Sequence, residues 1–192
     1  MMNDLLVKSL PLETPEEFPD FGNLVTTRAL KIDDAAAFRV LRLETLQYYG
    51  EIFANYHEEM KKKPFEFWRD FCMPTKDKSL FGLFILDKLM GVMGAQKWDE
   101  DKTGKTALWS YSYLRPEYRG RGLAASLYKA RENWTREHSN YDRAVFYIRD
   151  GNNRSRSIHE RHEAHYLYTK EMNWYDGPKA TWHWFEKKSL LP

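Results

Sequence analysis

The feature that most constrains this 192-residue chain is a glycine-containing turn, Arg119 to Ala124, which follows an aromatic run and leads into a helical pattern. A strand that ends in such a turn and opens a helix makes an anion site, because the first N–H groups of the helix point outward and the helix dipole favours negative charge. Gly120 and Gly122 lack a Cβ, so a phosphate can come close to the backbone. Arg119 and Arg121 add positive charge. The turn predicts a diphosphate-binding site, and the alternative is a turn whose glycines serve only the local geometry.

The composition indicates one globular domain without a nucleic-acid or membrane partner. Apolar residues make up 42% of the chain and charged residues 30%, which permits a core and excludes wholesale disorder. The net charge of +2 is too small for a dedicated nucleic-acid binder. Cys72 is the single cysteine, which fits a reducing compartment. Because the sequence contains neither a secretory signal pattern nor an apolar run as long as a membrane span, we expect a cytoplasmic protein.

Residue patterns divide the chain into an N-terminal arm, residues 1–22, and one domain, residues 23–192. The arm contains three prolines and an acidic patch, which prevent a long helix. In the domain, periodicity and turn residues predict strands over 23–32, 79–86, 89–98, 106–115, 144–149, 166–174 and 180–186. They predict helices after Asp33-Asp34, over 56–62, from Pro64 to Phe71, after Gly122 and over 155–164. The first helix is expected to bury an apolar stripe formed by Ala36, Ala37, Val40, Leu41 and Leu43.

The order of these elements predicts the fold class. Three sequential strands are most simply an antiparallel meander, with Asp87-Lys88 as one of its tight turns. The strand–helix–strand unit that follows the meander implies a parallel pair. We therefore expect an α/β fold with a mixed, mostly antiparallel sheet flanked by helices on both faces.

The arrangement resembles the GNAT superfamily of N-acetyltransferases over most of the chain, residues 23–188. The family motif, Arg/Gln-x-x-Gly-x-Gly/Ala on a strand-to-helix turn, reads here Arg119-Gly120-Arg121-Gly122-Leu123-Ala124. A weaker similarity, from Leu41 to Glu59, is to the helix pair that covers the acceptor site in many of these enzymes. The resemblance implies a GNAT-like fold and an acyltransferase.

The resemblance also implies acetyl coenzyme A as co-substrate and a set of residues that would bind it. The diphosphate would lie on the N–H groups of Arg119, Gly120, Arg121, Gly122, Leu123 and Ala124. The pantetheine arm would pair with the backbone around Tyr113 and Leu114, where an N–H could also stabilise the oxyanion. Asn152 and Ser155 could hold the pantetheine amides, cap the following helix, or do both.

The residues that would move protons are less clearly indicated, because the strand before the turn carries no carboxylate. Glu100 in the preceding loop is a candidate base, and carboxylates on the first helices, such as Glu44, could act through water. His159 stands where the family often has a tyrosine acid, if the segment is aligned on Asn152, whereas an alignment on Tyr166 puts Arg161 there. His159 could donate a proton, Arg161 could not, and Tyr166 is a substitute.

The predicted function is transfer of acetyl from acetyl coenzyme A to a primary amine by direct attack in a ternary complex. The alternative is a non-catalytic module that binds or senses acyl coenzyme A. The acceptor, a small molecule or a peptide, cannot be identified from the sequence, and the closing strand could pair across a homodimer. His159, His162 and His165 recur every third residue, which would permit a metal-binding pair. They do not form His-Glu-x-x-His, so a solvated His-rich helix is favoured and no metal is expected.

Overall fold

The computed structural model describes residues 24–53, 57–137, 141–173 and 179–188. Its strands are β1 (Val25–Ala29), β2 (Lys78–Ile85), β3 (Lys88–Lys97), β4 (Thr106–Leu114), β5 (Arg143–Arg149), β6 (His165–Asn173) and β7 (Lys179–Lys187). Its α-helices are α1 (Ala35–Tyr49), α2 (His57–Lys61), α3 (Phe65–Cys72), α4 (Ala124–Glu137) and α5 (Asn153–Arg161), joined by short 3-10 helices that include η3 (Gly50–Ile52) and η4 (Pro116–Tyr118). The predicted N-terminal arm lies outside the described residues.

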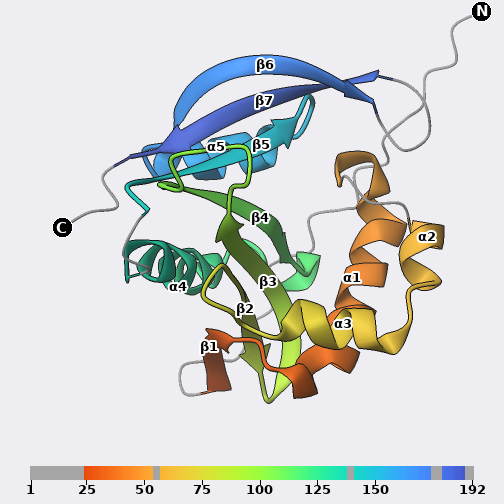
Figure 1. The fold of residues 1–192 in the computed structure, drawn as a ribbon. Helices are drawn as coiled ribbons and strands as arrows, with labels where there is room; N and C mark the ends of the chain where they lie inside the picture. The colour runs from red at the N-terminus through yellow and green to blue at the C-terminus, as the bar shows by residue number, and fades with distance from the viewer. Residues whose placement is uncertain (1–23, 54–56, 138–140, 174–178, 189–192) are drawn as a thin grey trace, which may run out of the picture.

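The strands form one seven-stranded sheet in the order β1-β2-β3-β4-β5-β7-β6 (Figure 1). All neighbouring pairs are antiparallel except β4 and β5, which run parallel. The predicted meander is therefore β2-β3-β4, and the strand–helix–strand unit is β4-α4-β5. This confirms the predicted mixed, mostly antiparallel sheet.

β4 and β5 pair only over their first residues and then separate. Their register covers Thr106–Leu108 against Arg143–Val145 and ends there, and Figure 1 shows the two strands starting together and diverging. The register of β4 against β3 shifts between Val92 and Gly94, which marks a bulge in β4, and Tyr111 in this bulge has a φ of 56°. A bulge bends its strand and increases the local twist, so it directs the end of β4 away from β5.

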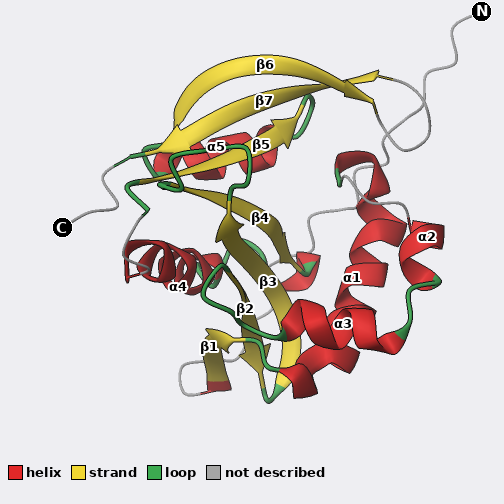
Figure 2. Cartoon of the chain, viewed as in Figure 1, coloured by secondary structure: helices red, strands yellow, loops and turns green. Residues whose placement is uncertain are grey.

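Helices cover both faces of the sheet, and each face has its own apolar core (Figure 2). One core lies between α4 and residues such as Trp109 and Phe146, and the other lies under α1 and α3 around Phe38 and Trp68. None of the helices described is both long and apolar enough to cross a lipid bilayer.

The predicted buried stripe of α1 is wrong in phase. Ala36, Ala37 and Val40 are exposed, and the buried face is formed by Ala35, Phe38, Leu41, Arg42, Thr45 and Leu46. Arg42 and Thr45 are polar residues on the buried side, so counting apolar residues could not find this face. Leu41 is the one predicted residue that is fully buried.

Two local details concern the start of α1 and the turn between β2 and β3. Asp34 does not cap α1 with its side chain, because its carboxylate accepts hydrogen bonds from Arg28 and from the Lys31 N–H. The turn between β2 and β3 is Leu86-Asp87, one residue earlier than expected, and both residues have positive φ, 48° and 60°. Positive φ at both central residues is the geometry of a type I′ hairpin turn.

Candidate active site

The glycine turn, Arg119–Ala124, lies between η4 and the start of α4. Gly120 and Gly122 have φ of 77° and 75°, in the left-handed region that favours glycine. A Cβ at either position would meet nothing within 4 Å, so both face open space. Among the described residues, no backbone hydrogen bond outside the helices and strands starts at the N–H of Gly120, Gly122, Leu123 or Ala124. The turn therefore presents backbone donors on an open surface.

The end of β4 precedes this turn. Along one edge of the strand, which we call the peptide edge, backbone N–H and carbonyl groups face the gap beside β5. Arg115 donates its N–H to the Met90 carbonyl of β3 at 3.0 Å. Because ladder bonds alternate along an antiparallel strand, Leu114 directs its N–H and carbonyl to the opposite edge. Arg119 Nε donates to that carbonyl at 2.6 Å, while its guanidinium lies over the rings of Tyr49 and Tyr113. Arg119 is therefore held against the end of β4.

The N-terminus of α5 lies near the same place. Asn152 Oδ1 accepts the N–H of Ser155 at 3.2 Å, which confirms the expected helix cap. The pKa of Arg154 is lowered by its burial and then by the positive charge of Arg119. Two guanidinium groups are thus close enough to repel, an arrangement that a bound anion would relieve. The start of α5, with Asn152 and Ser155, thus lies within electrostatic range of Arg119 in the glycine turn.

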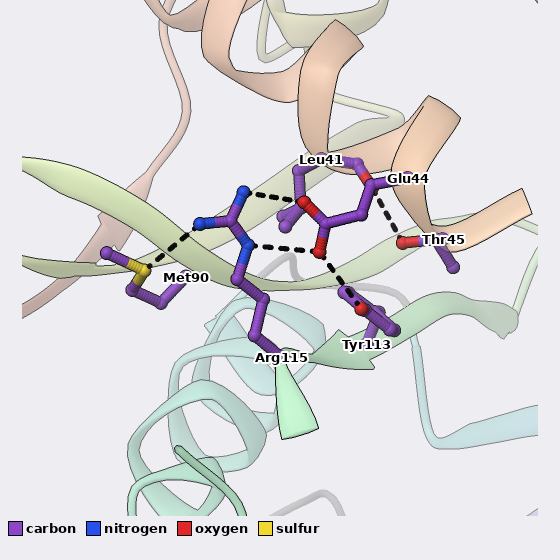
Figure 3. A network of polar contacts seen from close by, with 6 residues as sticks. All are labelled: Leu41, Glu44, Thr45, Met90, Tyr113 and Arg115. Atoms are coloured by element: carbon purple, nitrogen blue, oxygen red, sulfur yellow. Dashed lines mark hydrogen bonds and ion pairs between the residues drawn. The ribbon is translucent and has the colours of Figure 1, made fainter. Parts of the chain in front are cut away.

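Glu44 is part of a polar network that joins α1 to β4 (Figure 3). Its carboxylate accepts hydrogen bonds from Arg115 Nη2 at 2.7 Å, Arg115 Nε at 3.1 Å and the Tyr113 hydroxyl at 3.3 Å. Burial and then the nearby Glu44 charge raise the pKa of Tyr113 to about 12. The three donors occupy the Glu44 carboxylate, so Glu44 positions the strand end that precedes the glycine turn.

His159 is buried in α5, with 5% of its surface exposed. Its ring stacks on Phe146 of β5 at 3.9 Å. Burial, followed by the charges of Arg131 and His162, lowers the pKa of His159 well below its ordinary 6.5. The ring is therefore neutral at neutral pH, so it lacks the imidazolium proton that the predicted acid role requires.

Tyr166 and Glu100, the other two predicted catalytic residues, share no hydrogen bond or ion pair with His159 or with each other among the described residues. Tyr166 is on the edge strand β6, 56% exposed, with its hydroxyl 2.8 Å from Thr169 Oγ1. Glu100 is exposed in the loop before β4, near Tyr168, whose pKa is raised by burial and then by the Glu100 charge. The glycine turn follows the other end of β4, a strand about 26 Å long at ~3.3 Å per residue. The structure does not join the three residues in one hydrogen-bonded group.

Two buried arginines are not among the residues predicted from the sequence. Arg131 of α4 is 0% exposed, and Arg42 of α1 is 4% exposed. Burial lowers the pKa of each guanidinium to about 10. Arg42 lies over the rings of Phe53 and Tyr111 on the α1 face. One sequence signal could have indicated that Arg131 is buried. Arg131 lies at helical spacing from Leu127 and Trp134, which are apolar residues on the buried face of α4.

No group of His, Cys, Asp and Glu side chains in the part of the chain that the structure describes could hold a metal ion. The three closely spaced histidines lie in different surroundings: His159 is buried on Phe146, His162 stacks on Tyr128 at 3.8 Å, and His165 begins β6.

Comparisons with known proteins agree with this geometry. Residues 39–164 match the model of the acetyltransferase (GNAT) family. Among curated proteins, none matches the sequence. Solved structures with the same fold include a GNAT acetyltransferase from Streptococcus pneumoniae, with 12% identity, a TM-score of 0.73, and coverage of 85% of this chain and 98% of the other.

Two further structures of this fold come from Salmonella typhimurium. One is yncA with its cofactor acetyl-CoA, at 14% identity and a TM-score of 0.72, covering 85% of this chain and 93% of the other. The other is an acetyltransferase that modifies the N-terminal serine of the ribosomal protein L7/L12, at 14% identity and a TM-score of 0.68, covering 88% of this chain and 97% of the other. At these identities the structures establish the fold, and the family match covers well over half of the sequence. The chain belongs to the acetyltransferase (GNAT) family.

Proposed function

We propose that this protein transfers acetyl from acetyl coenzyme A to a primary amine by direct attack in a ternary complex. The observation that carries the proposal is the glycine turn at the end of a strand that has separated from its parallel neighbour. The turn supplies backbone donors for a diphosphate, and the separated strands leave a peptide edge along which an extended arm can pair. Family membership indicates the acyl group and the reaction class.

The turn fits a diphosphate in charge and in shape. Gly120 and Gly122 leave the space in front of the backbone open, and the helix that begins at Ala124 adds its dipole. Arg119 and Arg154 lie close to one another at this place, so an anion between them would reduce their repulsion. The remaining predicted contacts, from Tyr113, Leu114, Arg121, Leu123, Asn152 and Ser155, belong to this proposal.

The acetyl thioester supplies an acyl carbon that an amine can attack without a covalent enzyme intermediate. The protein would orient it by its peptide edge at Leu114, whose N–H faces the gap, and by the bulge at Tyr111. The acceptor would approach from the face that α1 and η3 cover, where Arg149 of β5 donates a hydrogen bond to the Glu51 carbonyl of η3. Glu100, Tyr166 and His159 remain predictions for proton transfer, and the neutral state of His159 does not favour it as the acid.

A second function, a non-catalytic module that binds acyl coenzyme A, is favoured by one observation. The three predicted catalytic residues share no hydrogen bond or ion pair among the described residues, and His159 is neutral and buried. A protein that only binds the cofactor needs the glycine turn and the peptide edge but no proton-transfer residues.

The experiment that separates the two functions combines calorimetry with a turnover assay. Titration with coenzyme A should show binding in both cases. Release of free thiol from acetyl coenzyme A is then followed over a library of amines, amino acids and peptides with free N-termini. Sustained thiol release that depends on one class of amine supports the transferase. Binding without thiol release over the whole library supports the module, and absence of binding at millimolar coenzyme A excludes both.

A further inference from the structure

A buried cluster lies where β4 and β5 separate, on the face covered by α4 and α5. The guanidinium of Arg131 lies over the Trp109 ring, 4.1 Å from its centre, and Arg131 Nη1 donates to Ser112 Oγ at 2.9 Å. Trp109 stacks on Phe146 across the two strands, and Phe146 stacks on His159. We call these five residues, Arg131, Ser112, Trp109, Phe146 and His159, the Arg131 cluster.

The position of the cluster follows from the strand register. The last paired residues of β4 and β5 are Leu108 and Val145, so Trp109 and Phe146 are the first residues beyond the pairing. Arg131 and His159 pack on these two rings from the helix side, and Ser112 lies farther along the separated part of β4. The Arg131 cluster thus closes the narrow end of the gap between the strands.

The glycine turn precedes the first residue of α4, and Arg131 lies farther along the same helix. The turn opens α4 at Ala124, and Arg131 follows seven residues later, about 10 Å along the helix at ~1.5 Å per residue. A ligand that is anchored by its diphosphate at the turn and follows the free edge of β4 from Leu114 toward Trp109 would approach the Arg131 cluster with its far end.

The polar atoms of the cluster are incompletely bonded. Arg131 Nε and Nη2 and His159 Nδ1 are all buried and have no hydrogen-bond partner among the described residues. The Tyr128 hydroxyl is close enough to influence the pKa of Arg131 but does not meet hydrogen-bond geometry. No described carboxylate forms an ion pair with Arg131, since Glu132 beside it pairs with Lys187. A fully buried cation with two unbonded nitrogens costs stability, so an acceptor atom of a ligand that reached these nitrogens would be stabilised there.

We propose that the guanidinium of Arg131 receives the sulfur of coenzyme A and stabilises the thiolate that leaves when the amide forms. The inference rests on the proposed transferase function. The amine nitrogen bonds to the acyl carbon, the carbon–sulfur bond breaks, and its electron pair leaves on sulfur, while the ammonium proton passes to water. Charge stabilisation by Arg131 replaces protonation of sulfur, which accounts for a site whose predicted acid, His159, is neutral.

The ionisable groups around Arg131 must be considered in any pH measurement. Tyr128 and Glu132 lie on its own helix, His159 and His162 lie on α5, and Lys187 of β7 contacts Glu132. Burial raises the pKa of Tyr128 to about 12, so this group stays neutral where a thiol titrates. Both histidine pKa values are lowered, chiefly by burial. Arg131 is the cation of the cluster in that range.

The test is the pKa of the thiol of bound coenzyme A, followed by the ultraviolet absorbance of the thiolate during a pH titration. A thiol has an ordinary pKa of about 8.5, and a guanidinium beside an anion lowers a pKa by about 1–3 units. We expect bound coenzyme A in the unmodified protein to titrate at least about one unit below the free compound, and Arg131→Met to remove the shift. Arg131→Lys should keep part of it. Arg136→Met, an exposed arginine on the same helix, is the matched control and should keep all of it.

A second measurement uses only the unmodified protein, so its result does not depend on whether the Arg131 variants fold. Because thiolate and guanidinium attract, the unmodified protein should prefer coenzyme A over its desulfo analogue increasingly as the pH rises toward the free thiol pKa. A normal thiol pKa in bound coenzyme A, or an affinity ratio that does not change with pH, would overturn the role of Arg131 even if the protein turns over. Failure to bind either compound would instead contradict the proposed function.

Discussion

The glycine turn and the Arg131 cluster present positive character to a ligand in opposite ways. The turn uses backbone N–H groups and a helix dipole on an open surface, where Gly120 and Gly122 make room. The cluster uses one side-chain charge that is fully buried among aromatic rings. Backbone donors at a helix start cost little because they lack intrahelical partners in any case, whereas a buried guanidinium must be desolvated. The turn is therefore suited to binding a ligand tightly, and the cluster is suited to stabilising a negative charge that develops only during the reaction.

The largest effect that follows from this comparison is at Gly122. We expect Gly122→Trp to weaken coenzyme A binding at least about 100-fold, since the loss of even two hydrogen bonds to a charged group, each ~1.5–3 kcal/mol, has that effect. The side chain would enter the open space before the turn, and its positive φ would add strain. Isothermal titration gives the affinity directly.

The matched control for this prediction is Gly104→Trp. Gly104 has a φ of 69° and also faces open space, but it lies in the loop before β4. Both variants carry the same backbone strain, so only their effect on binding should differ. Equal affinities of the two variants would mean that the turn does not hold the diphosphate.

The next largest effect concerns Glu44, which links α1 to the end of β4, just before the glycine turn. Glu44→Gln removes the charge that holds Arg115 and Tyr113, and we expect a loss of about 2 kcal/mol in the free energy of unfolding, since half-buried hydrogen bonds to charged groups contribute ~1.5–3 kcal/mol. Urea denaturation measures this. Glu171→Gln is the control, because the Glu171–Lys179 pair is exposed at 3.8 Å and should contribute less than about 1 kcal/mol. Equal losses would show that Glu44 does not anchor α1.

Arg131→Met sharpens the comparison through stability. We expect the free energy of unfolding to change by no more than about 2 kcal/mol while thiol release falls, because relief of two unbonded buried nitrogens, each ~1–3 kcal/mol, is offset by loss of the Ser112 hydrogen bond and of two cation–π contacts. Urea denaturation and the thiol-release assay are run on the same sample. A variant that is less stable and equally active would identify Arg131 as a structural residue.

The same contrast explains what the sequence could predict. The glycine turn is contiguous, its conformation is set by Gly120 and Gly122, and its strand and helix follow from local periodicity, so the strand–turn–helix unit and the mixed, mostly antiparallel sheet were predicted correctly. The stripe of α1 was predicted in the wrong phase, because Arg42 and Thr45 occupy buried positions that only tertiary packing explains.

The candidate catalytic residues could not be predicted in this way. His159 was chosen by its position after Asn152, but its protonation depends on Phe146 and Arg131, which lie on other elements. The helical spacing of Arg131 with Leu127 and Trp134 indicates only that Arg131 faces the core. The Arg131 cluster unites residues of β4, α4, β5 and α5, so the partners that surround the charge follow from the assembled sheet and not from a local pattern.

The smallest effect we predict tests the electrostatics of the Arg131 cluster by pH. The lowered pKa of His159 means that the unfolded chain binds its proton first as the pH falls. The stabilising contribution of the neutral ring is complete above the unfolded pKa of about 6.5 and is lost as the pH falls toward the folded value. Between about pH 7.5 and about pH 5.5 this loss amounts to ~1 kcal/mol.

We expect the free energy of unfolding of His159→Gln to fall less over that range than that of the unmodified protein, as measured by urea denaturation at a series of pH values. Parallel curves would show that Arg131 and the aromatic rings do not hold His159 neutral, and the positive charge assigned to the cluster would then have to be shared between the two side chains.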